Sequence, residues 1–266
     1  MKDKIELSKS HLLLIPSYNT GALLKNTVTE ALQQWLPVWV IIDGSDDGSE
    51  TLLQSLQAEY PDALLVIKTS ENRGKGAAVL TGVIQAKQQG FSHVLTMDAD
   101  YQHPASFIKQ FMQASAANPK AMILGEPVFD DSAPMIRVKG RQISNWWASL
   151  ETLGWGIHDS LFGMRIYPIE DLIAVMYSTR WARRFDFEPE VAVRMAWRGV
   201  PVINIATPVR YISLQEGGVS QFKYVRDNVL LTGMHIRLFC GFLLRLPKLL
   251  LCNRKVRNKH ETTSRY

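Results

Sequence analysis

The chain has 266 residues, of which 46% are hydrophobic and 21% are charged. This composition allows one large domain with a sizeable core and excludes extensive disorder. The net charge is +5, but residues 245–266 alone hold seven Lys or Arg against one Glu. Because the rest of the chain is nearly neutral, we expect no nucleic-acid partner.

The two cysteines, Cys240 and Cys252, lie outside any CxxC or Cys/His cluster. This argues against a disulfide framework and indicates a reducing compartment. Residues 1–10 alternate charged and polar side chains without the apolar run of a signal peptide. We therefore expect a cytoplasmic protein.

Short apolar runs alternate with helical patterns through the first half of the chain. Strands are predicted at 11–15, 38–42, 63–67, 93–97 and 121–124, and helices at 22–36, 50–59, 76–89 and 104–117. This alternation predicts an α/β fold with a mostly parallel central sheet flanked by helices. Beyond Asp130 the pattern is less regular, with helices expected at 141–153 and 183–199 and a strand at 200–205.

Polar, turn-forming residues follow three of the predicted strands. They are Ser17-Tyr18-Asn19, Asp43-Gly44-Ser45 and Asp98-Ala99-Asp100. Any single cluster is explained by the turn that must follow a strand. Three clusters favour a ligand site, because ligands of such sheets bind outside the carboxyl ends of the strands.

Asp98-Ala99-Asp100 is the central motif of this edge. Two carboxylates at the end of a buried strand can hold one hard divalent cation together with diphosphate oxygens, and Gln102 could add a neutral oxygen. The alternative is that Asp98 caps the turn and Asp100 faces solvent. The position directly after the 93–97 strand favours the metal site.

The Gly-rich segment 71–78, Glu-Asn-Arg-Gly-Lys-Gly-Ala-Ala, resembles a phosphate loop only superficially. A Walker A loop has Lys after its last Gly and then Ser or Thr, whereas Gly76 follows Lys75 here. Backbone N–H groups and Lys75 at a helix start could instead approach a diphosphate. A plain glycine turn that lets helix and strand pack is an equal alternative.

Two further charged segments are candidates for the acceptor side of the site. Asp186 and Glu188 lie near a predicted helix start, where acids are favoured by the helix dipole, although either could accept a proton from a hydroxyl. Asp159 and Arg165 flank Gly163, and the pair is explained either by substrate contact or by a surface ion pair.

The segment 229–252 is apolar but carries His235, Arg237, Arg245 and Lys248. A membrane-spanning helix needs about 20 mostly apolar residues, which disfavours spanning here. Apolar residues interspersed with cations, followed by a basic tail, favour a helix in the membrane interface. The alternative is a helix packed on the domain. We expect residues 1–215 to form the main domain and 216–266 an amphipathic helical segment with a basic tail.

Four motifs together resemble family 2 glycosyltransferases, and most closely the dolichol-phosphate mannose synthase-like branch. They are Ile15-Pro-Ser-Tyr-Asn19, Ile42-Asp-Gly-Ser-Asp-Asp-Gly-Ser49, Asn72-Arg-Gly-Lys-Gly-Ala77 and Met97-Asp-Ala-Asp-Tyr-Gln-His-Pro104. The resemblance covers about residues 12–221. It implies a GT-A (Rossmann-like) fold and an inverting transfer from a nucleotide sugar.

The resemblance also implies roles for individual residues. Pro16, Tyr18 and Asp43 match nucleoside-binding positions, and Ala99 lies against the nucleotide. Asp98, Asp100 and Gln102 match the ligands of a divalent cation, Mg²⁺ or Mn²⁺. Positions that frame the acceptor are matched by Asp159, Gly163, Arg165 and Gln221, while Asp186 and Glu188 fall in the acidic segment.

These features predict a metal-dependent glycosyltransferase with a lipid-linked acceptor, working at the inner face of the membrane as a peripheral protein. A lipid phosphate acceptor would need no general base, whereas a hydroxyl acceptor would need Glu188 or Asp186. Two alternatives remain, a nucleotidyltransferase and a non-catalytic scaffold that binds nucleotide sugar or lipid.

Overall fold

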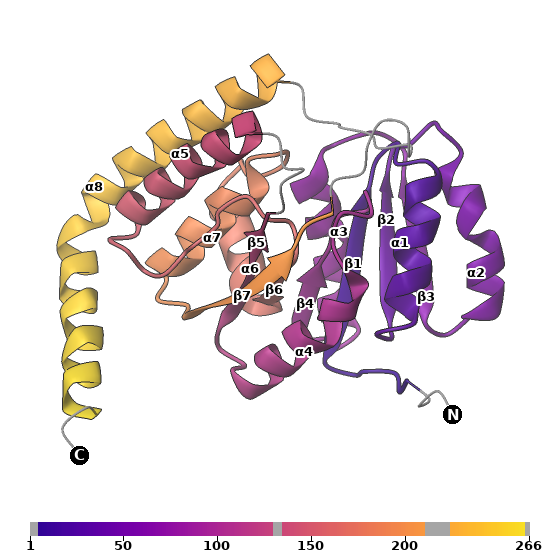
Figure 1. The fold of residues 1–266 in the computed structure, drawn as a ribbon, viewed down its shortest axis with the longest axis horizontal. Helices are drawn as coiled ribbons and strands as arrows, with labels where there is room; N and C mark the ends of the chain where they lie inside the picture. Colours follow the sequence, from indigo (N-terminus) through magenta and orange to yellow (C-terminus); the bar gives the residue numbers. More distant parts are fainter. Residues whose placement is uncertain (1–4, 130–134, 211–223, 264–266) are drawn as a thin grey trace.

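The computed structural model describes residues 5–129, 135–210 and 224–263, with the side chains of 136, 137, 224 and 252–263 left aside. Figure 1 shows one central sheet with helices on both faces. The strands are β1 (His11–Ser17), β2 (Val38–Asp43), β3 (Leu64–Thr69), β4 (His93–Thr96), β5 (Met122–Val128), β6 (Arg165–Pro168) and β7 (Val202–Pro208).

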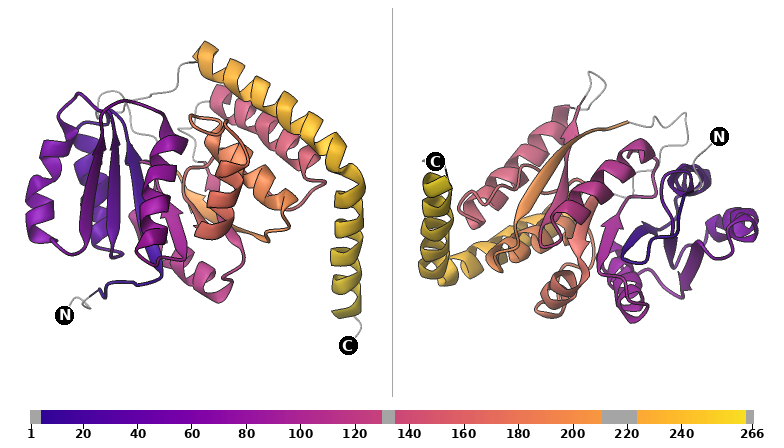
Figure 2. Two further views of the ribbon diagram at one scale, coloured as in Figure 1. Left: turned by 180° about the vertical axis from the view of Figure 1, so that it is seen from behind. Right: turned by 90° about the horizontal axis from the view of Figure 1, so that it is seen from below.

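The helices are α1 (Ala22–Leu32), α2 (Gln54–Glu59), α3 (Lys75–Gln88), α4 (Ile108–Ala117), α5 (Met135–Glu151), α6 (Ile169–Tyr177), α7 (Phe187–Trp197) and α8 (Tyr224–Thr263). Two 3₁₀ turns, η1 (Ser49–Leu53) and η2 (Ala105–Phe107), precede α2 and α4. Figure 2 shows the same arrangement of helices around the sheet from two further sides.

The sheet has the strand order β3-β2-β1-β4-β6-β5-β7. All neighbouring pairs are parallel except those that β6 makes with β4 and β5. The predicted α/β class and mostly parallel sheet are therefore confirmed. Because β6 runs in the opposite direction, its first residue, Arg165, pairs with Thr96 at the carboxyl end of β4. The segment before β6 thus reaches the same edge as Asp98.

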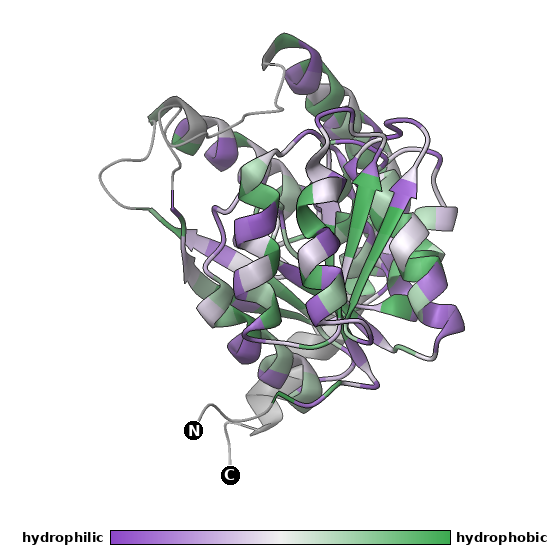
Figure 3. Ribbon diagram, turned by 90° about the vertical axis from the view of Figure 1, so that its right-hand side faces the viewer, coloured by the Kyte–Doolittle hydropathy of each residue, from purple (hydrophilic) through white to green (hydrophobic). Residues whose placement is uncertain are grey.

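Alternate residues of the strands face the two halves of the core. Leu12, Leu14 and Ile41 pack toward α3, α6 and α7, whereas Leu13 and Ile15 pack toward α1 and α4. This period of two is the side-chain alternation of a strand. Figure 3 shows the strands largely in the hydrophobic colour and polar residues mostly on the outer faces of the helices.

Several predicted boundaries differ from the structure. The first helix ends at Leu32 and not at Leu36, before the Leu36–Pro37 bond where proline disfavours a helical residue before it. The helix expected at 183–199 begins only at Phe187, because residues 183–186 form turns. In the less regular half, the sequence reading missed β6 and α6.

Helix α8 is longer than the apolar segment that predicted it, and it continues through Pro247. Its first half packs on α5 and α7, with Met234, Leu238 and Phe242 buried. Its C-terminal part extends away from the rest of the chain in Figures 1 and 2, although Arg245 still lies over the ring of Trp197 and Leu249 is buried. The segment Val225–Leu251 is long and apolar enough to cross a membrane, although 22% of its most apolar window is buried. The expected boundary at 215 lies outside the described residues.

Candidate active site

Asp98 lies just beyond β4, at the centre of the carboxyl edge of the sheet. Its Oδ1 contacts the ammonium group of Lys75, which also contacts Oε1 of Glu188 on α7. His103 Nε2 lies 3.2 Å from Oδ2 of Asp98. Two carboxylates from distant parts of the chain therefore share one lysine.

Charge fixes the protonation of this cluster. Burial alone would raise the pKa of Asp98, but Lys75 and His103 outweigh it and hold that pKa well below its ordinary value. Burial would lower the pKa of Lys75, yet Asp98 and Glu188 raise it instead. Asp98 is thus a carboxylate at neutral pH, and Lys75 is a cation.

Asp100 differs from Asp98 in its surroundings. Burial and the neighbouring charge of Asp98 raise its pKa. Its Oδ1 accepts a hydrogen bond of 3.2 Å from the backbone N–H of Gln102. Because like charges raise each other's pKa, a cation that neutralises this pair would favour the ionised form of Asp100.

The residues at this edge offer oxygen atoms of the kind that a divalent cation binds. Two of the three predicted ligands, Asp98 and Gln102, line the same recess of about 100 Å³, together with His103, Arg141, Phe162 and Gly163, whereas Asp100 is not among its lining residues. In the described part of the chain, no three His, Cys, Asp or Glu side chains are grouped to hold a metal by themselves. Two carboxylates and an amide suit a hard ion that takes its other ligands from water and diphosphate oxygens.

The glycine-rich loop is held by Asp43 at the end of β2. The buried carboxylate of Asp43 accepts hydrogen bonds from the backbone N–H of Arg73, at 3.2 Å, and of Gly74, at 2.7 Å. Gly74 has a φ of 100°, which favours glycine. These two N–H groups are therefore occupied, and Lys75 is the part of the loop that reaches the carboxylate of Asp98.

The remaining nucleotide-binding candidates border the same edge. Pro16 is buried near the end of β1, and Tyr18 follows this strand, partly exposed. Ala99 is buried, and its carbonyl accepts a hydrogen bond of 3.1 Å from the Thr27 hydroxyl. Their assignment to the nucleoside stays a prediction.

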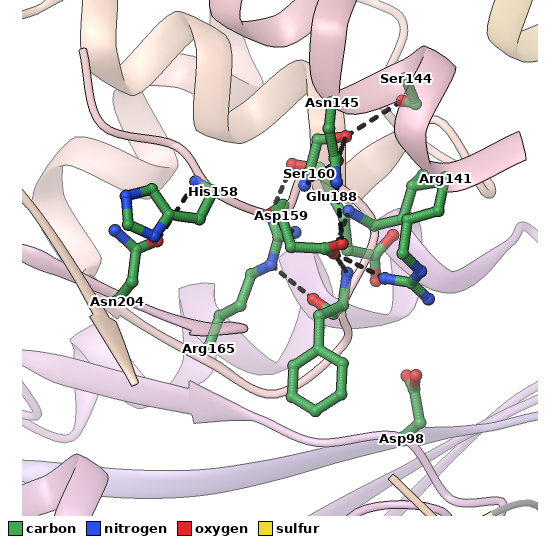
Figure 4. A network of polar contacts seen from close by, with 12 residues as sticks. Asp98, Arg141, Ser144, Asn145, His158, Asp159, Ser160, Arg165, Glu188 and Asn204 are labelled. Carbon is green, nitrogen blue, oxygen red and sulfur yellow. Dashed lines mark hydrogen bonds and ion pairs between the residues drawn. The ribbon is translucent and has the colours of Figure 1, made fainter. Parts of the chain in front are cut away.

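Asp159 and Arg165, two of the acceptor-side candidates, lie in one polar network, which Figure 4 shows near Asp98. Asp159 is buried; its Oδ1 accepts hydrogen bonds from the N–H groups of Leu161 and Phe162 and pairs with Arg141 at 2.6 Å. Arg165 is fully buried and donates to the carbonyls of Phe162, Glu188 and Asp159. The alternative of a surface ion pair between Asp159 and Arg165 is therefore wrong.

The two candidate proton acceptors on the acidic segment have different surroundings. Glu188 is buried and faces the site through Lys75. Asp186 instead accepts hydrogen bonds from the backbone N–H of Ala182 and Arg184, both at 3.0 Å. Asp186 thus holds the turn before α7, and Glu188 is the one in contact with the cluster.

Two residues of this site, His103 and Arg141, were not among the candidates predicted from the sequence. His103 directly follows Gln102, and this position beside the predicted metal ligands could have indicated that it belongs to the site. Arg141 was read only as a helix start, and nothing local linked it to Asp159. Gln221 lies outside the described residues.

Comparison with known proteins agrees with this geometry. The model of the family described as "Glycosyl transferase family 2" matches residues 13–183. The chain belongs to this family. The glycosyltransferase is 28% identical over 225 residues to polyprenol monophosphomannose synthase of Mycolicibacterium smegmatis. The aligned region covers 79% of this chain and 80% of that relative.

A second relative differs in its sugar. It is the UDP-N-acetylglucosamine–dolichyl-phosphate N-acetylglucosaminyltransferase of Methanococcus voltae, 24% identical over 65% of this chain and 75% of the relative. Among solved structures, glucosyl-3-phosphoglycerate synthase of Mycobacterium tuberculosis, in complex with Mn²⁺, UDP and glucosyl-3-phosphoglycerate, aligns with a TM-score of 0.63 at 14% identity. It covers 88% of this chain and 80% of that structure, and it supports the fold.

Proposed function

We propose that this glycosyltransferase is metal-dependent and inverting, and that it transfers the sugar of a nucleoside diphosphate sugar to a polyprenyl phosphate. The observation that carries the proposal is the meeting of two segments at one edge of the sheet. The segment Asp98-Ala99-Asp100 after β4 supplies carboxylates for a cation, and the segment before β6 contacts Asp98. The two curated relatives named above support the lipid phosphate acceptor.

In this proposal Asp98, Asp100 and Gln102 hold the divalent ion, which would offset negative charge on the departing nucleoside diphosphate. Lys75 contributes a second positive charge beside Asp98. A phosphate acceptor is already an anionic nucleophile and needs no base. Glu188 would serve as a base only for a hydroxyl acceptor.

The anionic acceptor also needs positive charge on its own side of the site. Arg141 lines the recess with Asp98, and its guanidinium is partly exposed. Arg165 is buried and bound to three carbonyls, so it shapes the loop. We therefore assign phosphate recognition to Arg141 and a scaffold role to Arg165.

The second half of α8 supports a peripheral membrane contact at the cytoplasmic face. Leu243, Leu244, Leu250 and Leu251 are exposed, and Arg245 and Lys248 lie among them. Apolar side chains with interspersed cations suit a surface of anionic lipid. Such a contact would hold the enzyme where a lipid-linked acceptor is found.

The test is a two-stage assay with purified protein. Thermal shift with Mn²⁺ or Mg²⁺ and a panel of nucleotide sugars identifies the donor, since a ligand that binds the folded state raises its stability. Transfer to a polyprenyl monophosphate in detergent micelles is then measured, with Asp98→Asn and Asp100→Asn as variants. We expect release of nucleoside diphosphate and a loss of at least about a hundredfold in either variant.

Two results would overturn the proposal. Release of pyrophosphate would identify a nucleotidyltransferase. Metal-dependent donor binding without transfer to any acceptor would identify a non-catalytic binding protein.

A further inference from the structure

His235 is a buried polar residue on the inner face of α8, where Met234 and Leu238 are also buried. Its Nδ1 lies 3.0 Å from Oε1 of Glu151, and its Nε2 lies 3.1 Å from Oγ of Ser144. Both partners are buried on α5. Burying an imidazole costs free energy unless its nitrogens are hydrogen-bonded, so these two contacts favour one position of α8 relative to α5.

The contacts continue from Ser144 to the segment before β6. Ser144 Oγ lies 3.0 Å from Oγ of Ser160. Ser160 donates both its N–H and its hydroxyl to Oδ1 of Asn145, each at 2.8 Å. Asn145 in turn donates from Nδ2 to Oδ2 of Asp159 at 3.1 Å. Figure 4 shows this part of the chain of contacts reaching toward Asp98.

The number of available hydrogen atoms determines which group donates in each hydrogen bond of this series. The backbone N–H of Ser160 identifies Oδ1 of Asn145 as the acceptor, so the Ser160 hydroxyl must donate to it as well. Ser144 must then give its one hydroxyl hydrogen to Ser160. Nε2 of His235 must therefore carry a hydrogen and donate it to Ser144.

The last contact, between Nδ1 of His235 and Glu151, also needs a hydrogen. It lies on Nδ1 if His235 is an imidazolium beside a carboxylate, or on Glu151 if both groups are neutral. Burial raises the pKa of Glu151. Its other oxygen, Oε2, is buried and has no hydrogen-bond partner in the described part of the chain. In both forms the pair shares one proton.

We propose that His235 is a positioning residue for the acceptor-side segment, residues 157–163, and that it acts through Ser144, Ser160 and Asn145 on Asp159. The proposal rests on the proposed function, because Asp159 and its partner Arg141 belong to the acceptor side. Its consequence is that the seating of α8 and the geometry of the acceptor segment are coupled.

Ser144→Ala interrupts the chain without removing apolar contact between α5 and α8. Ser149→Ala is the matched control, because Ser149 lies on the same helix and is exposed. Hydrogen–deuterium exchange of peptides covering 157–163 is the first readout, and it needs no substrate. We expect exchange about fivefold faster in Ser144→Ala than in the control, the value for one lost hydrogen bond.

The second readout is kinetic, with a polyprenyl monophosphate in micelles as acceptor. Ser144→Ala should raise the acceptor KM about fivefold and leave the donor KM within about twofold of the control. A merely structural role would lower thermal stability and change both constants together. Equal exchange and equal acceptor KM in the two variants would overturn the proposal.

Two variants of His235 separate the hydrogen bond from the packing. In His235→Gln the side-chain amide nitrogen can donate to Ser144, whereas His235→Leu keeps apolar packing but has no donor there. We expect the 157–163 segment to stay protected in His235→Gln and to exchange faster in His235→Leu. Equal exchange in these two variants would contradict the assigned role of His235. An enzyme that transfers no sugar would refute only the proposed function, because exchange is measured without substrate.

Discussion

Gly163 lies so close to Asp98 that a Cβ at position 163 would sit 2.1 Å from Oδ2 of the carboxylate. The segment before β6 thus packs directly on the proposed metal ligand. Only a hydrogen fits at this position, and the contact ties the acceptor side to the metal side.

Gly163→Ala should therefore displace the Asp98 carboxylate and lower kcat/KM by at least about a hundredfold, as small displacements of reacting groups do. Gly140→Ala is the control, since a Cβ there meets nothing within 4 Å. A control with normal activity and a Gly163→Ala protein with weakened Mn²⁺ binding would agree with this. Full activity of Gly163→Ala would show that the segment moves freely.

Lys75 lies between Asp98 and Glu188, and a metal ion held by Asp98 would also neutralise the first of these carboxylates. Lys75→Gln should lower the stability of the metal-free enzyme by about 3–5 kcal/mol, because Asp98 and Glu188 lose their shared cation. Added Mn²⁺ should then raise Tm more in the variant than in the wild type. Lys68→Gln, which removes an exposed surface pair with Glu50, should leave the metal response unchanged.

The different contacts of Asp186 and Glu188 predict different defects. Glu188→Gln should lower kcat while leaving Tm nearly unchanged, because it removes charge beside Lys75 but leaves Lys75 paired with Asp98. Asp186→Asn should lower stability by about 1 kcal/mol, because it weakens the hydrogen bonds from Ala182 and Arg184. Differential scanning calorimetry and steady-state kinetics on the same preparations distinguish the two effects. The reverse pattern would mean that Asp186 acts in catalysis.

His11 predicts how stability depends on pH. It is buried and stacked on His93 with ring centroids 4.5 Å apart, and burial and His93 lower its pKa from 6.5 to about 4. Between these values the unfolded chain binds a proton that the folded chain does not. Stability is therefore fully present above about pH 6.5 and falls as pH decreases toward 4.

His11→Gln should reduce the loss of unfolding free energy between pH 7 and pH 4 by about 1–3 kcal/mol, as measured by urea unfolding. His158→Gln serves as control, because the His158 side chain is exposed. If both variants keep the wild-type slope, another group causes the acid sensitivity.

The exposed leucines of α8 predict membrane binding. Replacing Leu243, Leu244, Leu250 and Leu251 with Ser should abolish flotation with vesicles containing anionic phospholipid, while Leu52→Ser should not. Substitution is preferable to deleting residues 229–266, because Met234 and Leu238 on α8 belong to the core. Flotation of the fourfold variant at the wild-type level would place the contact elsewhere.

The sequence predicted the parallel half of the fold well, because the runs 12–15 and 38–42 are fully apolar and polar turns follow both strands. It missed β6 because Arg165-Ile-Tyr-Pro168 is short and contains a cation and a proline. Burial of Arg165 depends on carbonyls from three separate positions, which no local pattern reveals.

The site shows the same limit. Asp98, Asp100 and Gln102 were recognisable because they are close in sequence and follow a strand. The contact of Lys75 with Glu188 joins positions more than a hundred residues apart, so only the folded chain brings them together. The chain from His235 to Asp159 was likewise invisible, since each of its residues is common in any helix or loop.

The reversed direction of β6 has a consequence for how specificity is encoded. The candidate donor and metal residues up to Gln102 belong to one continuous stretch, whereas Arg141 to Gly163 come from a separate stretch that follows β5 in the sequence. Under the proposed function, substitutions in the second stretch would change the acceptor side without altering the candidate nucleotide-binding residues.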